Sequence, residues 1–580
     1  MIKEYSQNRN NAILNFSTNY CKTPNELLES IAFNKVLNSY IETLEKQSSA
    51  LLERIASFSL DKNISEALSE LFKLLIVLDT KEIKGLNKTY EELLNHKEDI
   101  IDFIEGLYNY WRSLERYALI QKETITSGIE HSRFISESTK FSNLILQVYR
   151  RIEENLKGFE QNVYRQLKAG INAGIVLSHV DTKLPNKYKE FDRINFINKI
   201  ILMPPFIMYP GENKREGLFE EVFENLLSKL NIHQDHYFCF PAKVGEFLAF
   251  VYFHRDFMNH GISLANLFEL AKQEEIENQK PDLIYVFGAR LDNQKRETVF
   301  YDDKETDTLV GYVSNTENVD YFGYMKKMIL TLHNVKMLNK RHLPIHGAMV
   351  NITLKNGISK NIAIMGDSGA GKSESLEAFR TLSEDYLKEM KIIFDDMGTF
   401  KVINGEVYGY GTEIGAFVRL DDLDIGYSFK QMDRAIFMNP NRINARLLLP
   451  VTTYEAINKG FKVDIFLYAN NYVDEDNVLT FFKDIKEAKA VFTNGARMAK
   501  GTTQEKGIVT SYFANPFGLV QRKPQTDPII SNIFEALYQT NVEVGQIYTK
   551  LAIPGMEQKG PNYAAKALFK WINSEKQSSK

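Results

Sequence analysis

The stretch NIAIMGDSGAGKSESLEAF, at 361–379, decides the fold of the second half of this chain. It consists of an apolar run, a glycine-rich turn and an amphipathic segment, which is the strand–loop–helix context that a phosphate-binding P-loop requires. The glycines let the backbone curl so that several N–H groups point inward. Those donors and the N-terminus of the following helix bind phosphate oxygens. The alternative is a chance match in a glycine-containing turn, which the flanking strand and helix patterns disfavour.

Two residues at the end of the predicted loop are expected to contact the phosphates of ATP and their metal ion. Lys372 is expected to reach the outer phosphates of ATP, and the hydroxyl of Ser373 to bind Mg²⁺. The expected nucleotide-binding residues of the loop are Gly366, Asp367, Ser368, Gly369, Ala370, Gly371, Lys372 and Ser373.

A second apolar run, IIFDD at 392–396, ends in two aspartates. This pattern predicts a buried strand that delivers Asp395 and Asp396 to the carboxyl edge of the sheet, where ligands bind in α/β folds. Both are candidate metal ligands, one acting directly and the other through water. The alternative is that they cap the segment that follows.

Three parts are expected along the chain. Apolar residues at helical spacing, scarce glycine and a capping box at 23–26 predict a helical bundle over the first 165 or so residues. Strand-like runs separated by turn formers begin near residue 190, and strands alternate with helices from about 345 onward. We therefore expect an all-α domain at 1–185 for oligomerisation or regulation, a substrate lobe at 186–335 and a nucleotide-binding lobe at 336–580.

Composition excludes several classes of protein. The 580 residues include 71 basic and 75 acidic side chains, a net charge of −4, which argues against nucleic-acid binding. The two cysteines, Cys21 and Cys239, cannot supply a disulfide framework or a thiolate zinc site. The chain starts without an apolar signal region and has no apolar run long enough to span a membrane. We expect a cytoplasmic protein with no membrane partner.

Six further segments, in a fixed order along the chain, resemble the family of ATP-type phosphoenolpyruvate carboxykinases. They are YFGYMKKMIL (321–330), LPIHGAMVNI (343–352), TEIGAFVRL (412–420), INARLLLP (443–450), TNGARMAKGTTQEKG (493–507) and ANPFG (514–518). The resemblance covers about 281–570 and implies a two-lobed, mixed-sheet P-loop kinase fold. The GDSGAGKSES loop by itself is equally similar to HPr kinase/phosphorylase, a member of the same superfamily.

The resemblance implies a Mn²⁺ site made by Lys327, His346 and Asp396. A nitrogen-rich set with one carboxylate suits Mn²⁺ better than Mg²⁺. Lys327 can coordinate a metal only when it is neutral, and nearby cations would lower its pKa. Taken singly, a Lys-Lys pair is usually a solvated face and a lone histidine is usually structural. The ordered set with the P-loop favours the metal site.

The resemblance also implies which residues contact substrate and nucleotide. Lys326 and Tyr321 would face the substrate, and Arg446 would contact the transferring phosphoryl group and the enolate. Glu413 and Arg419 match positions near the nucleotide. Lys559, in EQKGPNYAAK at 557–566, takes the approximate place of a nucleotide-binding arginine.

One expected residue of the family has no direct match. In this family an arginine on an early basic loop binds the substrate carboxylate. The nearest stretch here, MYPGENKREGLF at 208–219, places Glu212 at that position. Lys214 or Arg215 on a shifted loop, or Arg255 in FHRDF, are the alternatives.

Three functions follow from these observations. The first is an ATP-dependent carboxykinase that uses Mn²⁺ and Mg²⁺ to convert the dicarboxylate oxaloacetate, with ATP, to phosphoenolpyruvate, CO₂ and ADP. The second is a kinase of the same superfamily that acts on another small metabolite or on a protein serine. The third is a nucleotide-sensing assembly protein whose helical N-terminal domain binds a partner.

Overall fold

The structure is a computed structural model that divides the chain into two compact units. The first contains Met1–Ser178 and Ile197–Met203, and the second contains His179–Phe196 and Pro204–Lys580. The structure describes residues 3–58, 60–121, 128–130, 133–160, 168–211, 218–230, 232–291, 296–367, 369–382, 386–420, 430–442, 445–499 and 506–578, without the side chains of 373, 381 and 575–578.

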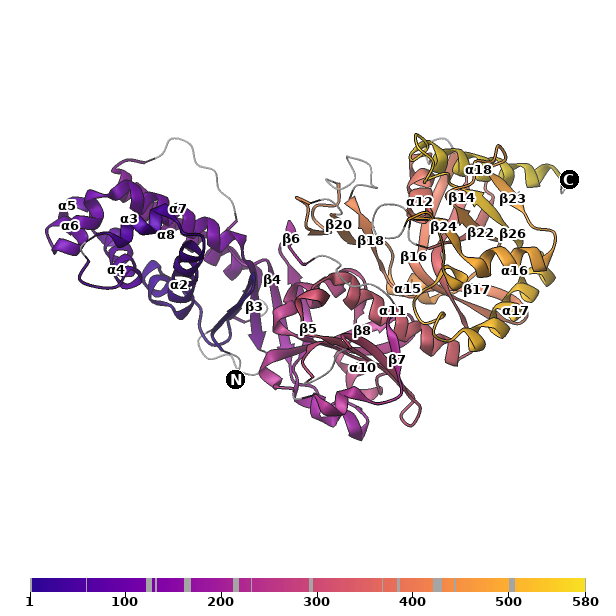
Figure 1. The fold of residues 1–580 in the computed structure, drawn as a ribbon, viewed down its shortest axis with the longest axis horizontal. Coiled ribbons are helices and arrows are strands. Elements are labelled where there is room, and N and C mark those ends of the chain that lie inside the picture. The colour runs from indigo at the N-terminus through magenta and orange to yellow at the C-terminus, as the bar shows by residue number, and fades with distance from the viewer. Residues whose placement is uncertain are drawn as a thin grey trace. The chain divides into compact units, whose positions relative to one another are not determined.

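Helices make up most of the first unit, and strands β1–β5 lie beside them (Figure 1). The elements are β1 (Tyr5–Asn8), β2 (Asn11–Asn15), α1 (Pro24–Glu29), α2 (Ile31–Lys46), α3 (Ala50–Ala56), α4 (Ile64–Val77), α5 (Thr80–Lys84), α6 (Lys88–Asn95), α7 (Lys97–Ser113), β3 (Glu115–Gln121), α8 (Phe134–Lys157), β4 (Ala173–Ser178) and β5 (Phe196–Leu202). Helix α1 begins where the capping pattern predicts. The Thr23 hydroxyl accepts from the Glu26 N–H, and Pro24 is the first helical residue.

The prediction of an all-α first unit is wrong. Strand β2 pairs parallel with β3, β3 pairs parallel with β4, and β1 pairs antiparallel with β2. The sequences ERYALIQ of β3 and AGIVLS of β4 are short and almost completely buried. Strands buried on both faces read as continuous apolar runs, so periodicity alone does not separate them from helix segments.

The second unit contains three sheets of four or more strands, and helix α11 (Phe322–Asn339) contacts strands β11 and β13 of the first. Within this unit the order of the first sheet is β8-β9-β11-β13-β12-β7, and β10 pairs with β8. Its strands are β7 (Glu220–Val222), β8 (Tyr237–Val244), β9 (Phe247–His254), β10 (Glu269–Leu270), β11 (Leu283–Ala289), β12 (Thr298–Asp303) and β13 (Thr308–Ser314), with helices α9 (Met258–Ser263) and α10 (Gln273–Asn278). The second sheet contains β18 (Gly415–Arg419), β20 (Arg446–Pro450), β19 (Ile436–Met438) and β6 (Phe206–Met208).

An eight-stranded sheet carries the predicted P-loop. In order, its strands are β21 (Phe461–Lys462), β17 (Glu406–Gly411), β16 (Leu387–Ile403), β14 (Leu343–Leu354), β15 (Ser359–Met365), β22 (Ile465–Asn470), β26 (Glu543–Tyr548) and β23 (Leu479–Phe481). The helices of this region are α12 (Lys372–Thr381), α15 (Tyr454–Asn458), α16 (Ile485–Asn494), α17 (Lys523–Gln539) and α18 (Lys559–Ser578), beside a hairpin of β24 (Ala496–Met498) and β25 (Ile508–Thr510).

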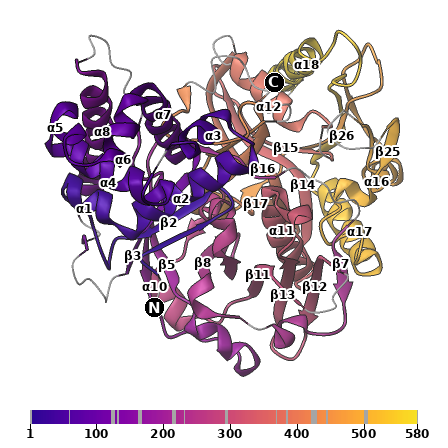
Figure 2. The same ribbon diagram turned by 60° about the vertical axis from the view of Figure 1, so that its left-hand side comes forward.

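Helices cover both faces of this sheet (Figures 1 and 2). Along β14 the side chains alternate between two cores: Ile345 and Met349 pack with α16 and α17, whereas Ala348 and Val350 pack with α12 and α18. The chain is therefore a mixed α/β protein with mixed sheets. Strands β15, β22 and β26 run parallel, so the segments that follow them meet at one edge of the sheet.

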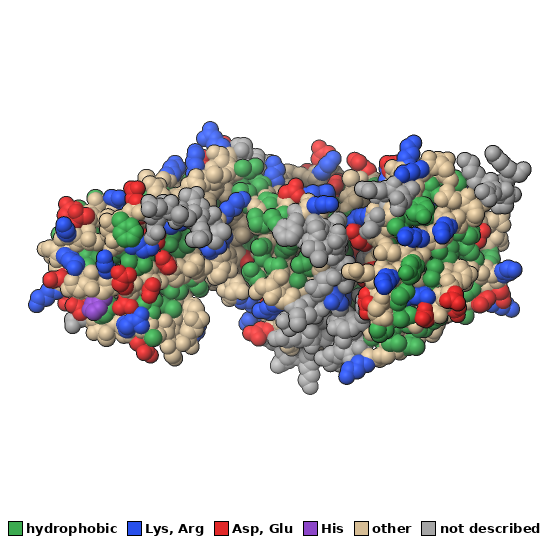
Figure 3. Space-filling model, turned by 90° about the horizontal axis from the view of Figure 1, so that it is seen from above, with side chains coloured by type: hydrophobic (Ala, Val, Ile, Leu, Met, Phe, Trp, Pro, Cys, Tyr) green, Lys and Arg blue, Asp and Glu red, His purple; other side chains and the backbone are tan. Residues whose placement is uncertain are grey.

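The described residues include no helix that is long and apolar enough to cross a membrane. On the face shown in Figure 3, basic and acidic side chains are interspersed, as the balanced composition predicts.

Candidate active site

The P-loop connects β15 to α12, as the sequence predicts. Gly369 and Gly371 have φ values of 80° and 102°, in the left-handed region that favours glycine. A Cβ on Gly371 would lie 2.6 Å from the hydroxyl of Thr549, so the loop also needs glycine here for space. Lys372 is buried and donates to the carbonyl oxygens of Gly366 and Asp367, at 2.6 and 3.2 Å. Ser368 and the side chain of Ser373 lie outside the described residues.

Two residues that directly follow the neighbouring strands β22 and β26 donate hydrogen bonds to the P-loop backbone. Asn471, directly after β22, donates to the carbonyl of Gly369 at 2.9 Å, and Thr549, directly after β26, donates to that of Ala370 at 2.9 Å. Both are fully buried. Neither residue belongs to a motif that the sequence predicts. The signal that marks them is a polar residue placed immediately after an apolar parallel strand.

Charged side chains from several elements meet beside the P-loop. Lys326 Nζ of α11 lies 2.5 Å from Asp396 Oδ2 of β16 and 3.2 Å from Glu413 Oε1, which follows β17. His346 Nε2 of β14 lies 3.1 Å from Asp396 Oδ1 and 3.5 Å from Lys372 Nζ. The structure therefore brings together the predicted residues Lys326, His346, Asp396 and Lys372.

The ring of His346 is held by a carbonyl. Its Nδ1 lies 2.7 Å from the carbonyl oxygen of Ala514. Because a carbonyl can only accept, Nδ1 carries a proton, and in the neutral ring Nε2 presents its lone pair toward Asp396. Phe513 and Ala514 both have positive φ, 52° and 45°, and this bend places the Ala514 carbonyl. Strained backbone of this kind is found mainly at functional sites.

The pair formed by His346 and Asp396 fits a divalent metal. A lone pair and a carboxylate oxygen face each other at 3.1 Å, and adjacent ligands at about 2.1 Å from an octahedral ion lie about 3.0 Å apart. Lys327 Nζ lies 5.9 Å from the centre of the Phe517 ring, which itself packs 5.5 Å from the His346 ring. Among the described residues, no group of three or more His, Cys, Asp or Glu side chains is placed to hold a metal ion. Lys327 or non-protein ligands would therefore complete the coordination of a metal at His346 and Asp396.

Asp395 and Asp396 lie within β16 and not at its end. The strand continues to Ile403 and pairs with β17, so the expectation that the aspartates end it is wrong. Asp396 has a φ of 88°, a conformation rarely adopted by residues other than glycine. This bend within the strand, opposite Gly347, accompanies the contacts that Asp396 makes with His346 and Lys326.

The three carboxyl groups of the cluster are held in different states. Burial opposes ionisation of Asp396, but the charge of Lys326 outweighs it and holds the pKa of Asp396 well below its usual value. Burial, and then the charge of Asp396, raise the pKa of Asp395. Burial raises the pKa of Glu413 to about 8 although Lys326 opposes this. One carboxylate is thus kept ionised beside two groups whose ionisation is made harder.

The two lysines of the cluster also differ. Burial alone would lower the pKa of Lys326, but Asp396 and Glu413 raise it above its usual value. For Lys372, burial is the largest influence and lowers the pKa. A phosphate chain at the loop would supply the negative charge that favours the ammonium form of Lys372.

Arg446 and Arg419 lie on the neighbouring strands β20 and β18. They pair in register between β18 and β20. The ring of Phe417 lies 5.6 Å from the Arg446 guanidinium and 5.8 Å from Lys326 Nζ, so these two cations share one aromatic neighbour. Arg446 therefore lies close to the cluster.

The described residues at the two ends of the 208–219 stretch lie near the start of α11. Gly211 packs against Asp320, where an added Cβ would lie 2.4 Å from the Asp320 carbonyl oxygen, and the ring of Phe219 lies 6.5 Å from that of Tyr324. Tyr321 is the residue that precedes α11, between these two contacts. Glu212, Lys214 and Arg215 lie outside the described residues.

Three other residues have distinct neighbourhoods. Arg255 lies beside a histidine cluster. Burial lowers the pKa of His236, and the charge of Arg255 lowers it further. Lys559 is exposed at the start of α18, and its neighbour Gly560 packs against the carbonyl of Thr549, next to the P-loop. Arg497, which the sequence analysis did not single out, lies 3.1 Å from Asp367 of the loop.

No family model matches this chain, and no curated protein sequence matches it. The function proposed below therefore depends on the residues and contacts of the cluster.

Proposed function

We propose that this protein is an ATP-dependent phosphoenolpyruvate carboxykinase-like enzyme. It would convert oxaloacetate and ATP to phosphoenolpyruvate, CO₂ and ADP. The proposal depends mainly on the contact between the P-loop and the His346–Asp396 pair. Lys372 Nζ of the P-loop lies 3.5 Å from His346 Nε2. A loop that only stores or senses a nucleotide has no need for a second cluster of buried charges at the same place.

In this proposal the chain would hold two metal ions and a nucleotide. The P-loop amides, Lys372 and the N-terminus of α12 would hold the phosphates, with Mg²⁺ at Ser373. His346, Asp396 and Lys327 would hold Mn²⁺. When bound, the metals would withdraw electron density from phosphoryl and carbonyl oxygens.

The reaction places negative charge where the chain supplies cations. The bond from C3 of oxaloacetate to its carboxylate breaks, CO₂ leaves, and the electron pair forms the enolate. The enolate oxygen then attacks the γ-phosphorus of ATP while the bond to the ADP oxygen breaks. Lys326, held charged by Asp396 and Glu413, and Arg446, on the same Phe417 ring, would offset the enolate and phosphoryl charges.

Two sequence observations favour a phosphoryl acceptor other than the enolate of oxaloacetate. The loop GDSGAGKSES is equally similar to that of HPr kinase/phosphorylase, and Glu212 stands where the carboxykinases have their carboxylate-binding arginine. A kinase that uses the same cluster with another small metabolite or a protein serine is the alternative. It needs the P-loop and the metal pair but no decarboxylation.

One assay distinguishes the two. The purified chain is incubated with ATP, Mn²⁺, Mg²⁺ and oxaloacetate, and phosphoenolpyruvate and CO₂ are measured. We expect both products in equal amounts. Lys372→Ala should lower kcat about a thousandfold, as the loss of a key electrostatic group does. Lys391→Ala, at an exposed lysine on β16, serves as the control. Nucleotide binding without phosphoenolpyruvate would contradict the carboxykinase and favour the kinase.

A further inference from the structure

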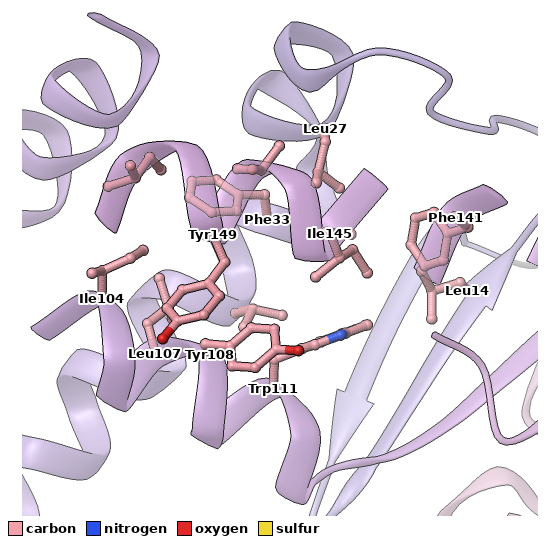
Figure 4. A pocket seen from close by; sticks show the side chains of 14 residues that line it. Leu14, Leu27, Phe33, Ile104, Leu107, Tyr108, Trp111, Phe141, Ile145 and Tyr149 are labelled. Atoms are coloured by element: carbon pink, nitrogen blue, oxygen red, sulfur yellow. The ribbon is translucent and has the colours of Figure 1, made fainter. Parts of the chain in front are cut away.

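The first unit contains an apolar cavity beside helices α2, α7 and α8 (Figure 4). Its volume is about 80 Å³, well below the roughly 300–1,000 Å³ of most small-molecule sites. The cavity therefore offers too little room for a ligand of ordinary size. In the second unit, by contrast, the P-loop has a feature that phosphate binding alone does not explain.

That feature is Asp367, which places a carboxylate in a loop that is expected to bind phosphates. Asp367 is the second residue of the loop and is buried, and its own carbonyl oxygen accepts from Lys372 Nζ. An uncompensated negative charge at this position would repel the phosphate chain of a nucleotide. The loop therefore needs another group to offset this charge and to fix where the carboxylate lies.

Arg497 of β24 supplies the opposing charge. Its Nε lies 3.1 Å from Asp367 Oδ2, and both side chains are buried. Solvent ions screen a buried pair of this kind much less than a surface pair. The guanidinium is thus placed to neutralise the carboxylate and to hold one of its oxygens.

Both neighbours of Arg497 in β24 are anchored, so the position of its backbone is fixed. The Tyr468 hydroxyl donates to the Ala496 carbonyl at 2.8 Å. The Asn471 side chain accepts from the Met498 N–H at 2.9 Å and donates to the Met498 carbonyl at 3.0 Å. Because the same Asn471 amide also donates to the P-loop backbone, one buried side chain holds the strand and the loop together.

The other oxygen of Asp367 faces His346. Asp367 Oδ1 lies 3.6 Å from His346 Nδ1, whereas Nε2 of the same ring faces Asp396. This distance is too long for a hydrogen bond, and Nδ1 already donates to the Ala514 carbonyl. A negative charge on the Nδ1 side nevertheless makes Nε2 a better electron-pair donor, and outer carboxylates of this kind typically change metal affinity about 10–100-fold.

We propose that Arg497 is a positioning residue. It holds the Asp367 carboxylate away from the phosphates of a nucleotide and beside Nδ1 of His346, so that one side chain of the P-loop serves the metal-binding pair. The proposal rests on the nucleotide and metal sites of the proposed function, but it does not depend on which acceptor receives the phosphoryl group.

The first test measures ADP binding by calorimetry, with a chelator and without divalent metal. Arg497→Gln leaves the Asp367 charge uncompensated, and the affinity should fall about tenfold. Asp367→Asn should bind ADP at least as tightly as the unaltered protein. The double variant contains neither charge, and its affinity should return to within about threefold of the unaltered value. A double variant that binds as weakly as Arg497→Gln would overturn the proposal, because Arg497 would then contact the nucleotide itself.

The second test measures Mn²⁺ binding to the nucleotide-free protein by the loss of the free-ion EPR signal. Asp367→Asn is nearly isosteric and should weaken Mn²⁺ binding about tenfold. Arg497→Gln should also weaken it, because the carboxylate is no longer held beside the ring. Unchanged Mn²⁺ affinity in Asp367→Asn would overturn the link to His346. Tighter Mn²⁺ binding by Arg497→Gln would overturn the positioning role, because the carboxylate would then act by its charge alone.

The double variant decides the proposal even if Arg497→Gln is too unstable to purify. It should keep ADP binding and lose Mn²⁺ affinity. The control is Arg522→Gln, which removes an arginine that pairs with Glu221 and Asp302, and it should leave both affinities within about twofold. An unaltered protein that makes no phosphoenolpyruvate but shows these affinities would contradict the carboxykinase and support the positioning role. An unaltered protein that binds no ADP would contradict both.

Discussion

The N-terminal and C-terminal halves of helix α11 hold buried ionisable side chains in opposite states. Lys326, near its start, is 3% exposed and has carboxylates at 2.5 and 3.2 Å. His333, about two turns later, is 0% exposed and lies edge-on to the ring of Phe247. Its Nδ1 lies 3.2 Å from the Asn334 amide oxygen, and its Nε2 has no partner among the described residues. Burial lowers the pKa of His333 to about 4, whereas two acids hold that of Lys326 above its usual value.

This difference separates structural burial from functional burial. A basic group that is simply buried loses its charge, as His333 does. Keeping Lys326 charged requires acids from other parts of the chain, Asp396 on β16 and Glu413 after β17. A buried ion pair is on balance no more stabilising than well-packed apolar residues. Clusters that hold a charge in this way are found preferentially at functional sites. The start of α11 is therefore the end at which chemistry is expected.

The largest expected effect is on turnover. Lys326→Met removes the cation but keeps the length of the side chain, and we expect kcat for the proposed phosphoryl transfer to fall about a thousandfold. Binding of ATP, measured by calorimetry, should change little because Lys372 and the loop are intact. The matched change at the other end, His333→Gln, should leave kcat within about twofold. Equal losses in the two variants would remove the distinction between the ends.

The next effect is on stability and concerns Glu413. In the unfolded chain this group ionises near 4.5, but in the folded protein only near 8. Ionisation of the unfolded state therefore lowers the free energy of unfolding as the pH rises from 4.5 to 8. Glu413→Gln removes that penalty, and the variant should gain about 4 kcal/mol relative to the unaltered protein between pH 4.5 and pH 8.

Urea unfolding of both proteins at the two pH values measures this gain. A stability difference that is the same at pH 4.5 and at pH 8 would show that Glu413 is not held protonated. Glu406→Gln, at a carboxylate of the same sheet that pairs with Lys462, provides a comparison.

The parts of the site that could be predicted from sequence are those that short, continuous sequence patterns identify. The P-loop is contained in one stretch of glycines between a strand and a helix, and Lys326, His346 and Asp396 stand in segments whose order along the chain is informative. The supporting contacts could not be predicted in the same way. The carbonyl of Ala514 reaches His346 across 168 positions, and Thr549 reaches Ala370 across 179. Such contacts depend on tertiary geometry, which has no periodic signal.

The same reasoning explains the fold. Alternating strands and helices after residue 345 predict the mixed sheet because each element is long enough to show its period. In the first unit, the helical pattern of α2 and α8 is clear, but β2 and β3 are buried strands of only five and seven residues. Their pairing is parallel and joins segments about a hundred positions apart. No turn signal marks such a pair, so only packing reveals it.

The smallest effect returns to His333 and tests whether burial alone keeps it neutral. The unfolded chain takes up a proton on this residue near pH 6.5, and the folded protein only near 4. The free energy of unfolding is therefore highest above pH 6.5, where His333 is neutral in both states, and it decreases as the pH falls toward 4. We expect a loss of about 2 kcal/mol by pH 5 that His333→Gln abolishes. His179→Gln, at an exposed histidine of the same unit, should leave the pH dependence unchanged. If His333→Gln also leaves it unchanged, His333 gains a compensating partner on protonation, and burial would then not distinguish the two ends of α11.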